Sequence, residues 1–320
     1  MLNKKTKIII IGFGSIGKRH YGNLLELGYN NLTIFDPADA AFKGFIRVDR
    51  IKILTEKELK NFTIAFICGP NDSHLKHALM CAKAGCKIFI EKPLTHNLKD
   101  IEKLMRILKK NKIINMVACN MRFHPCLEFI KNYISKNKLG KIYGIKHEFG
   151  YYLPYWRPGK DYRKNYAAKK STGGGIILDD IHEFDLLFWL NNFKKVKSVK
   201  FIYGKTSDLE IETEDFCLAS FLFANKVIGS VQCDYLQKNY TRNCKVLGEN
   251  GNLEWDFKEN IVWLKNKQGA KKLFVSKKFC FNKTYIKEIK YFFSCLMNSQ
   301  KTFNDVNAAA QILKYCIKKK

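Results

Sequence analysis

The sequence predicts an α/β protein with a doubly wound parallel sheet, followed by an α+β domain with a large, mostly antiparallel open sheet. Through residue 120, short apolar runs alternate with amphipathic stretches, and a Gly-rich turn follows the first run. Repeated βα units form parallel sheets with right-handed crossovers. Beyond residue 121, strand-like segments follow one another, joined by hairpin signals such as Asn250-Gly251. We therefore expect one domain over residues 1–121 and a second over 122–320.

Apolar periodicity predicts each element of the first domain. Residues 7–12 contain a continuous β-branched run, four isoleucines at 8–11, typical of a strand buried on both faces. Residues 15–27 follow as a helix that ends at Gly28, and residues 55–58 have the form of a capping box that opens a short helix. Further strands are expected at 32–35, 62–68, 86–90 and 113–119, and further helices at about 72–84 and 97–110.

The second domain is predicted to begin with a helix near 125–137 and a strand at 141–150. A polar and aromatic loop then runs to about residue 172, and a helix follows over 176–190. The remaining elements are strands at 196–204, 215–224, 226–236, 243–248, 252–257, 260–265 and 270–276, and closing helices at 283–297 and 305–317.

Composition narrows the possible functions. The 320 residues include 57 Lys and Arg against 29 Asp and Glu, a formal charge of +28, and 46 % are hydrophobic, which excludes intrinsic disorder. The excess charge is mostly Lys spread over every segment, without zinc-finger spacing or a basic region with heptads, so we expect no nucleic-acid partner. The apolar runs, such as residues 8–11, are far too short to span a bilayer, so we expect no membrane partner.

The cysteines predict a reduced, cytoplasmic protein. There are 11, an odd number, with no CxxC pair, and most lie in apolar runs. We also expect no metal site, because no paired His or Cys stands at ligand spacing.

A Gly-rich turn is the strongest local signal. It reads Gly12-Phe13-Gly14-Ser15-Ile16-Gly17, follows a strand and opens a helix. Gly12 permits the tight turn, Gly14 lets the backbone approach a pyrophosphate, and Gly17 packs the helix against the strand. Asp36 ends the next strand, where its carboxylate accepts hydrogen bonds from the adenosine ribose and repels a 2′-phosphate. We therefore expect NAD in preference to NADP, with a purely structural turn as the alternative.

Two further turns stand at predicted strand ends, where doubly wound sheets bind ligands. The first contains Cys68, Gly69, Pro70, Asn71 and His74, and the second is Glu91-Lys92-Pro93. Taken singly, the first is an ordinary turn with a helix cap and the second a surface charge pair. Their shared position at strand ends favours a cofactor site. Asn120 and Arg122 follow the last strand and are expected on its nicotinamide side.

A Gly-rich segment, residues 173–175, leads into the helix expected at 176–190. On that helix Asp179, His182 and Asp185 would share a face, so that a carboxylate could fix the imidazole tautomer and raise its basicity. The alternative for His182 is a satisfied core histidine.

In their order and spacing, these motifs resemble the Gfo/Idh/MocA family, and the resemblance covers nearly the whole chain. It implies a Rossmann domain, a C-terminal domain whose open sheet makes a homodimer or homotetramer, and NAD(P)-linked oxidation or reduction of a sugar, cyclitol or nucleotide-sugar hydroxyl. It also implies that Lys92 and His182 are the catalytic pair and Asp179 the associated carboxylate. Here Asp179 precedes His182 by three residues, whereas many members space the two by four.

A branch of surface-polysaccharide sugar-synthesis enzymes is similar in this spacing and in the loop at 151–172. Trp156 and Tyr162 could stack on a sugar ring, and Arg157 and Arg163 could form forked bonds to carboxylate or phosphate. The alternative is that these aromatics pack the loop. The expected substrate-binding residues are Lys92, Arg122, Tyr152, Trp156, Arg157, Tyr162, Arg163, Asp179 and His182.

The sequence thus predicts an NAD-dependent oxidoreductase acting on a sugar, sugar acid or nucleotide sugar. Two alternatives stay open at this point: an NAD-dependent glycosidase with transient oxidation, and a non-catalytic sugar or cofactor sensor.

Overall fold

The computed structural model describes residues 3–45 and 48–318, and the chain forms two compact units. The first contains the described residues up to Asn120 together with Tyr285–Leu313. The second contains Met121–Thr284 and the chain from Lys314 onward.

Six parallel strands form the sheet of the first unit, in the order β3-β2-β1-β4-β5-β6. This is the strand order of a dinucleotide-binding sheet, so the predicted doubly wound architecture is confirmed. The strands are β1 (Ile8–Ile11), β2 (Leu32–Phe35), β3 (Asp49–Arg50), β4 (Ile64–Ile67), β5 (Lys87–Ile90) and β6 (Asn115–Val117). β3 is two exposed polar residues long, so apolar periodicity does not reveal it.

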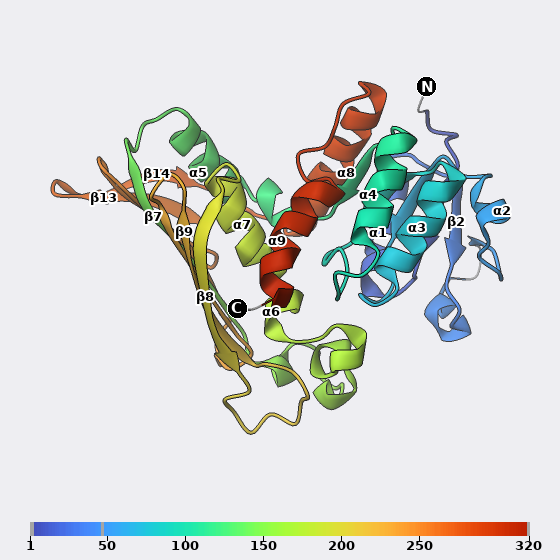
Figure 1. The fold of residues 1–320 in the computed structure, drawn as a ribbon, viewed down its shortest axis with the longest axis horizontal. Helices are drawn as coiled ribbons and strands as arrows, with labels where there is room; N and C mark the ends of the chain where they lie inside the picture. The colour runs from blue at the N-terminus through green and yellow to red at the C-terminus, as the bar shows by residue number, and fades with distance from the viewer. Residues whose placement is uncertain (1–2, 46–47, 319–320) are drawn as a thin grey trace. The chain divides into compact units, whose positions relative to one another are not determined.

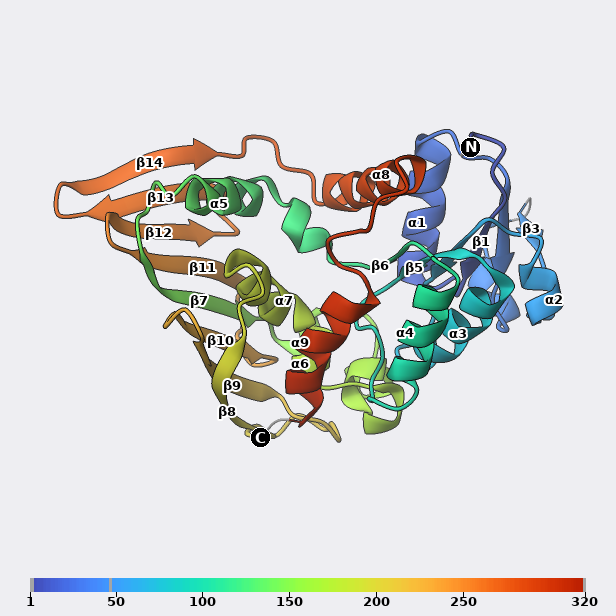
Figure 2. The same cartoon turned by 45° about the horizontal axis from the view of Figure 1, so that its top comes forward.

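Helices cover both faces of this sheet, with α1 and α8 on one face and α3 and α4 on the other (Figure 2). The helices of this part of the chain are α1 (Ser15–Glu26), α2 (Glu56–Leu59), α3 (His74–Ala84), α4 (Ile101–Lys110), α8 (Asn282–Met297) and α9 (Val306–Lys318), with a 3-10 turn η1 (Asp39–Phe42). Across the described residues, no helix is long and apolar enough to cross a membrane.

Aromatic packing explains why a late segment of the chain belongs to the first unit. The rings of Phe66 in β4 and Phe89 in β5 stack 4.7 Å apart, and Phe292 of α8 meets Phe89 at 5.5 Å. The Asn304 side chain donates a hydrogen bond of 2.8 Å to a carbonyl of the edge strand β6. Residues 285–313, which the sequence analysis placed in the second domain, therefore complete the core and the edge of this sheet.

Eight strands form the sheet of the second unit, in the order β14-β13-β12-β11-β7-β10-β9-β8. Every neighbouring pair is antiparallel except β7 with β10, which confirms the mostly antiparallel sheet. The strands are β7 (Ile142–Gly150), β8 (Val196–Gly204), β9 (Phe216–Phe223), β10 (Ile228–Asp234), β11 (Thr241–Gly248), β12 (Gly251–Asp256), β13 (Ile261–Asn266) and β14 (Gly269–Val275).

Helices α5 (Pro125–Ser135), α6 (Ile176–Asp179) and α7 (Ile181–Leu190) cover one face of this sheet (Figure 1). The opposite face exposes apolar side chains on β8, β9 and β10. Ile202 opposes Leu218 and Ile228 opposes Leu222, and Ile202 and Ile228 are 72 % and 60 % exposed.

The packing of α1 against the Gly-rich turn leads to a first prediction. A Cβ on Gly17 would lie 2.1 Å from the carbonyl oxygen of Gly12, whereas a Cβ on Gly22 of the same helix would meet nothing within 4 Å. We expect Gly17→Ala to cost about 1–3 kcal/mol through overpacking. Gly22→Ala should instead stabilise the helix by up to about 1 kcal/mol. Thermal unfolding of the two variants should shift in opposite directions, and equal shifts would contradict this reading of the turn.

Candidate active site

The Gly-rich turn packs closely against the start of α1 and against the turn after β4. Gly12 has φ +95°, and a Cβ on it would lie 2.4 Å from the backbone nitrogen of Gly69 in the turn after β4. Gly14 differs, because a Cβ there would meet nothing within 4 Å. Gly14 is also the N-cap residue of α1 and supplies no side-chain cap, so no capping side chain accepts from the first N–H groups of this helix. The residues therefore fit an anionic group such as a cofactor pyrophosphate.

Asp36 is fixed against this turn. Its Oδ2 accepts a hydrogen bond of 2.7 Å from the Phe13 N–H, and its Oδ1 accepts one of 2.9 Å from the Ala38 N–H. Each carboxylate oxygen has a further lone pair. The half-buried carboxylate can therefore accept ribose hydroxyls while its backbone contacts hold it in place.

His74 ties together the two turns that were predicted to line the cofactor site. It begins α3, is 1 % exposed, and its Nδ1 lies 2.8 Å from the Pro93 carbonyl oxygen. Its Nε2 lies 2.8 Å from the Gly69 carbonyl oxygen. Burial lowers the pKa of His74, and the two carbonyls only partly oppose that shift. In this structure the side chain braces the turns, and its contact with a cofactor stays a prediction.

Glu91 is a buried anion beside Lys92, contrary to the simple interpretation as a surface charge pair. It is 6 % exposed, its Oε1 lies 2.6 Å from His20 Nε2, and its Oε2 accepts the Lys92 backbone N–H at 3.2 Å. Burial alone would raise the pKa of Glu91, but the hydrogen bond and charge of His20 lower it overall. His20 was not among the predicted site residues, although it lies one turn after Gly17 on the buried face of α1, which points to a contact with the sheet.

The other predicted cofactor residues lie at the carboxyl ends of the strands or just beyond. Ser15 and Ile16 open α1, and Asn120 begins η2 (Asn120–Phe123). Cys68, Pro70 and Asn71 form the turn after β4, and burial together with the charge of Glu91 raises the pKa of the Cys68 thiol well above its usual range.

Two tyrosines, neither of them among the predicted site residues, hold Asp179. Tyr166 in η5 (Tyr166–Ala168) donates from its hydroxyl to Asp179 Oδ1. Tyr235, just after β10, donates to Asp179 Oδ2 at 3.1 Å. Burial and the charge of Asp179 raise the pKa of Tyr235, so it remains a neutral donor. Asp179 is buried, and the half-buried His182 follows three residues later near the start of α7.

The helix that carries these residues is interrupted, so the expected continuous helix over 176–190 is wrong. Asp180 lies between α6 and α7 with φ −107° and ψ 41°. Its carboxylate pairs with Arg242 of β11, and Arg242 Nε lies 2.8 Å from Glu183 Oε1. The break therefore coincides with a buried ion pair between the helical segment and the sheet.

The same break separates Asp179 in α6 from His182 and Asp185 in α7, although all three were expected on one helix face. Asp185 receives two bonds from Arg122, from Nε at 2.7 Å and from Nη2 at 2.6 Å. Arg122 is 2 % exposed and lies over the Trp189 and Phe193 rings. Its guanidinium is thus held by its own unit, and its predicted contacts with cofactor and substrate stay predictions.

His147 of β7 extends the Arg242 cluster. Its Nδ1 lies 3.1 Å from Glu183 Oε2, and its Nε2 lies 3.6 Å from Cys244 Sγ. Burial alone would lower the pKa of His147, but Cys244 and Glu183 together raise it to about 10.

In the loop at 151–172, some of the predicted ligand-binding residues pack against the protein and others are exposed. It contains the short helices η3 (Leu153–Tyr155), η4 (Tyr162–Lys164), η5 and η6 (Lys170–Thr172). Trp156 packs edge-on against Tyr235 and donates to the Tyr151 carbonyl at 2.9 Å. The Tyr152 ring lies under Lys238 Nζ.

The charged residues of this loop are also divided. Arg163 bonds to Asp161 at 2.9 Å and to Glu210 at 3.2 Å. The guanidinium that was predicted to bind a ligand thus already pairs with two carboxylates. Arg157 and Tyr162 instead line a cavity of about 360 Å³.

Comparison with known proteins identifies the class. Residues 6–119 match the oxidoreductase family with an NAD-binding Rossmann fold, and residues 128–254 match the GFO/IDH/MocA C-terminal domain. The chain belongs to the Gfo/Idh/MocA family of oxidoreductases.

Among its relatives, the myo-inositol 2-dehydrogenase of Thermotoga maritima is 28 % identical over 56 % of this chain and 53 % of its own length. The levoglucosan dehydrogenase of Pseudarthrobacter phenanthrenivorans is 27 % identical over 52 % of this chain and 47 % of its own length. The chain thus spans about half the length of these relatives in sequence.

Solved structures confirm the fold over a longer range. A levoglucosan dehydrogenase in complex with NADH has a TM-score of 0.84 at 18 % identity and covers 98 % of both chains. GenD2 from gentamicin A biosynthesis, in complex with NAD, has a TM-score of 0.81 at 15 % identity and covers 99 % of this chain and 93 % of its own.

The raised pKa of His147 predicts a pH-dependent stability. The folded protein holds this proton up to about pH 10, whereas an ordinary histidine releases it near 6.5. The stabilisation is therefore complete below pH 6.5 and is lost as the pH rises toward 10. We expect the free energy of unfolding in urea to fall across this window by a few kcal/mol, on the order of 1.4 kcal/mol per pKa unit at most. His147→Gln should flatten that slope, and parallel curves for the two proteins would contradict the assignment.

Proposed function

We propose that the protein is an NAD-dependent oxidoreductase that transfers a hydride between nicotinamide and a hydroxyl-bearing carbon of a sugar, sugar acid or nucleotide sugar. The observation that carries this proposal is the Asp36 carboxylate, fixed by two backbone N–H groups at an open Gly-rich turn. Family membership and the dehydrogenase names of its relatives support the reaction class.

In this proposal His182 removes the hydroxyl proton of the substrate as general base. Asp179 orients the imidazole, and two tyrosine hydroxyls fix the Asp179 carboxylate. Lys92 shares the proton or stabilises the developing alkoxide, and the buried charge of Glu91 lies beside it in the chain. Bound NAD would supply the hydride acceptor.

We further propose that the protein works as a homodimer or homotetramer in the cytoplasm. The apolar side chains Ile202, Leu218, Leu222 and Ile228 on the open sheet face support self-association. All eleven cysteines are free thiols and ten of them are buried, as suits a reducing compartment.

A substrate panel with NAD tests the reaction class. Free sugars, sugar acids and nucleotide sugars are supplied, and NADH formation is followed by absorbance. Lys92→Ala should lower kcat by about 10²–10⁴-fold, since general acid–base groups contribute that much, with little change in NADH binding. The exposed Lys99 provides the control variant Lys99→Ala, which should match the wild type. Full turnover by Lys92→Ala would refute the assigned role. Release of a leaving group without net NADH would indicate a glycosidase, and binding without any turnover would indicate a sensor.

The contacts of Asp36 predict the cofactor preference. Asp36→Ala removes an acceptor for the ribose hydroxyls and the charge that repels a 2′-phosphate. We expect NADH affinity to fall about 10–100-fold, the value of a hydrogen bond to a charged group, and NADPH affinity to rise. Titration of cofactor fluorescence measures both affinities, and thermal unfolding checks the fold. A wild-type enzyme that prefers NADPH would contradict the ribose assignment.

A further inference from the structure

The cavity in the loop at 151–172 has an unbalanced charge. Its lining consists of Leu153, Pro154, Arg157, Lys160, Asp161, Tyr162, Lys164 and Asn165. Three of these side chains are cationic and one is anionic. Among the described residues, Arg157, Lys160 and Lys164 form no ion pair. Like charges gathered in one cavity repel one another, so this lining favours an anion.

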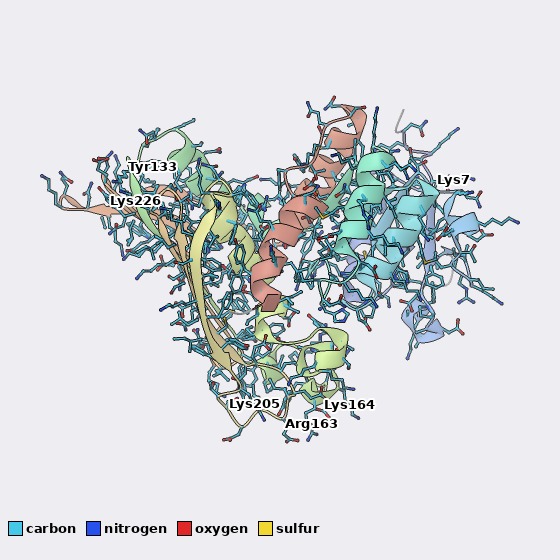
Figure 3. The ribbon with its side chains drawn as sticks, viewed as in Figure 1. Lys7, Tyr133, Arg163, Lys164, Lys205 and Lys226 are labelled. Carbon is cyan, nitrogen blue, oxygen red and sulfur yellow. The ribbon has the colours of Figure 1, made fainter. Side chains whose placement is uncertain are left out.

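The carboxylate of the cavity offsets only part of this positive charge. Asp161 is bound by Arg163, whose Nε and Nη2 lie 2.9 Å and 3.1 Å from its two oxygens. Hydrogen bonds from Arg163 lower the pKa of Asp161, so it stays ionised and paired. Arg163 also bonds to Glu210 at 3.2 Å, so this cluster of one cation and two carboxylates keeps one net negative charge. Figure 3 shows Arg163 and Lys164 on the solvent side of this loop. The exposed side chains of Arg157, Lys160 and Lys164 outnumber this one negative charge, so the cavity keeps a net positive charge.

Hydrogen bonds tie both ends of the cavity segment to the Asp179 site. At one end, the Leu153 N–H donates to the Tyr235 carbonyl at 3.0 Å, and the Tyr235 hydroxyl bonds to Asp179. At the other, the Tyr166 hydroxyl bonds to Asp179, and the Arg157 guanidinium lies 5.9 Å from the Tyr166 ring centre. The segment that lines the cavity is thus connected through Tyr235 and Tyr166 to the Asp179 carboxylate.

We propose that this cavity binds the anionic substituent, a phosphate or carboxylate group, of a sugar-like substrate. Its volume of about 360 Å³ lies in the range of small-molecule sites and accommodates more than a bare phosphate. The anion binding stands on the cavity alone, and only its connection to catalysis rests on the proposed function. Arg157 supplies a planar fork for two anion oxygens, and Lys160 and Lys164 supply point charges.

Calorimetric titration of the full chain tests the cavity without turnover. The probes are glucose, glucuronate and glucose 6-phosphate, which differ mainly in charge. Glucuronate or glucose 6-phosphate should bind at least about tenfold more tightly than glucose, because charge-assisted hydrogen bonds carry that difference. The comparison between the two anions identifies carboxylate or phosphate as the preferred group. Raising the ionic strength should weaken the binding of the anionic probes and leave the binding of glucose unchanged.

Arg157→Gln and the double variant Lys160→Gln/Lys164→Gln should each weaken the anionic probe by about tenfold per lost cation. Lys169→Gln is the matched control, because Lys169 is exposed in the same loop and does not line the cavity. The control should bind as the wild type does. Equal affinity for glucose and both anions, or wild-type affinity in the Gln variants, would overturn the proposal.

The panel assay separates this failure from that of the proposed function. If anion binding depends on Arg157 but no sugar gives NADH, the proposed anion site is supported and the proposed dehydrogenase activity is contradicted. If neutral and anionic sugars are turned over with equal kcat/KM, and the Gln variants do not change it, the dehydrogenase activity is supported and the proposed anion site is contradicted.

Discussion

The buried guanidinium of Arg242 holds the segment on which the proposed chemistry depends. It pairs with Asp180 and Glu183, which alternate along the chain with Asp179 and His182. Burying charged groups is costly, and removing one partner of such a cluster typically destabilises a protein by about 3–5 kcal/mol. The backbone leaves helical geometry at Asp180. The ion pairs of Arg242 thus attach the segment to the sheet at the point where the helix is interrupted.

The first unit also has a proposed catalytic residue next to a buried charged pair. Glu91 is a buried carboxylate, its partner His20 comes from α1, and Lys92 is the next residue along the chain. In both units a proposed catalytic residue thus neighbours a buried anion whose partner lies on a different element. Such an anion is costly to displace, because its partner would lose the compensating charge. The arrangement favours side chains that stay in place between turnovers.

Local patterns in the sequence predicted the fold and part of the site. The run of four isoleucines, the Gly-rich turn and Asp36 lie close together in the chain, so spacing alone predicted their arrangement. The partners of the buried acids could not be predicted, since His20 precedes Glu91 by 71 residues and Arg242 follows Asp180 by 62. The helix break was hidden, because the apolar residues continue on both sides of Asp180.

Two other errors have local causes. β3 lacks any apolar residue, so no hydrophobic pattern marks it. Arg163 seemed suited to a ligand, but Asp161 two residues earlier already occupies its fork. An arginine predicted to bind an anion should therefore first be checked against carboxylates two residues away.

The return of residues 285–313 to the first sheet bears on how the protein is made. A ribosome releases the strands of that sheet long before Phe292 and Asn304 exist to cover its aromatic face and edge strand. In the nascent first unit Phe66 and Phe89 stay uncovered on that side until residues 285–313 have been synthesised. Folding of the N-terminal unit is therefore completed only after residues 121–284 have been synthesised, and the growing chain is exposed to aggregation or chaperone capture in the interval.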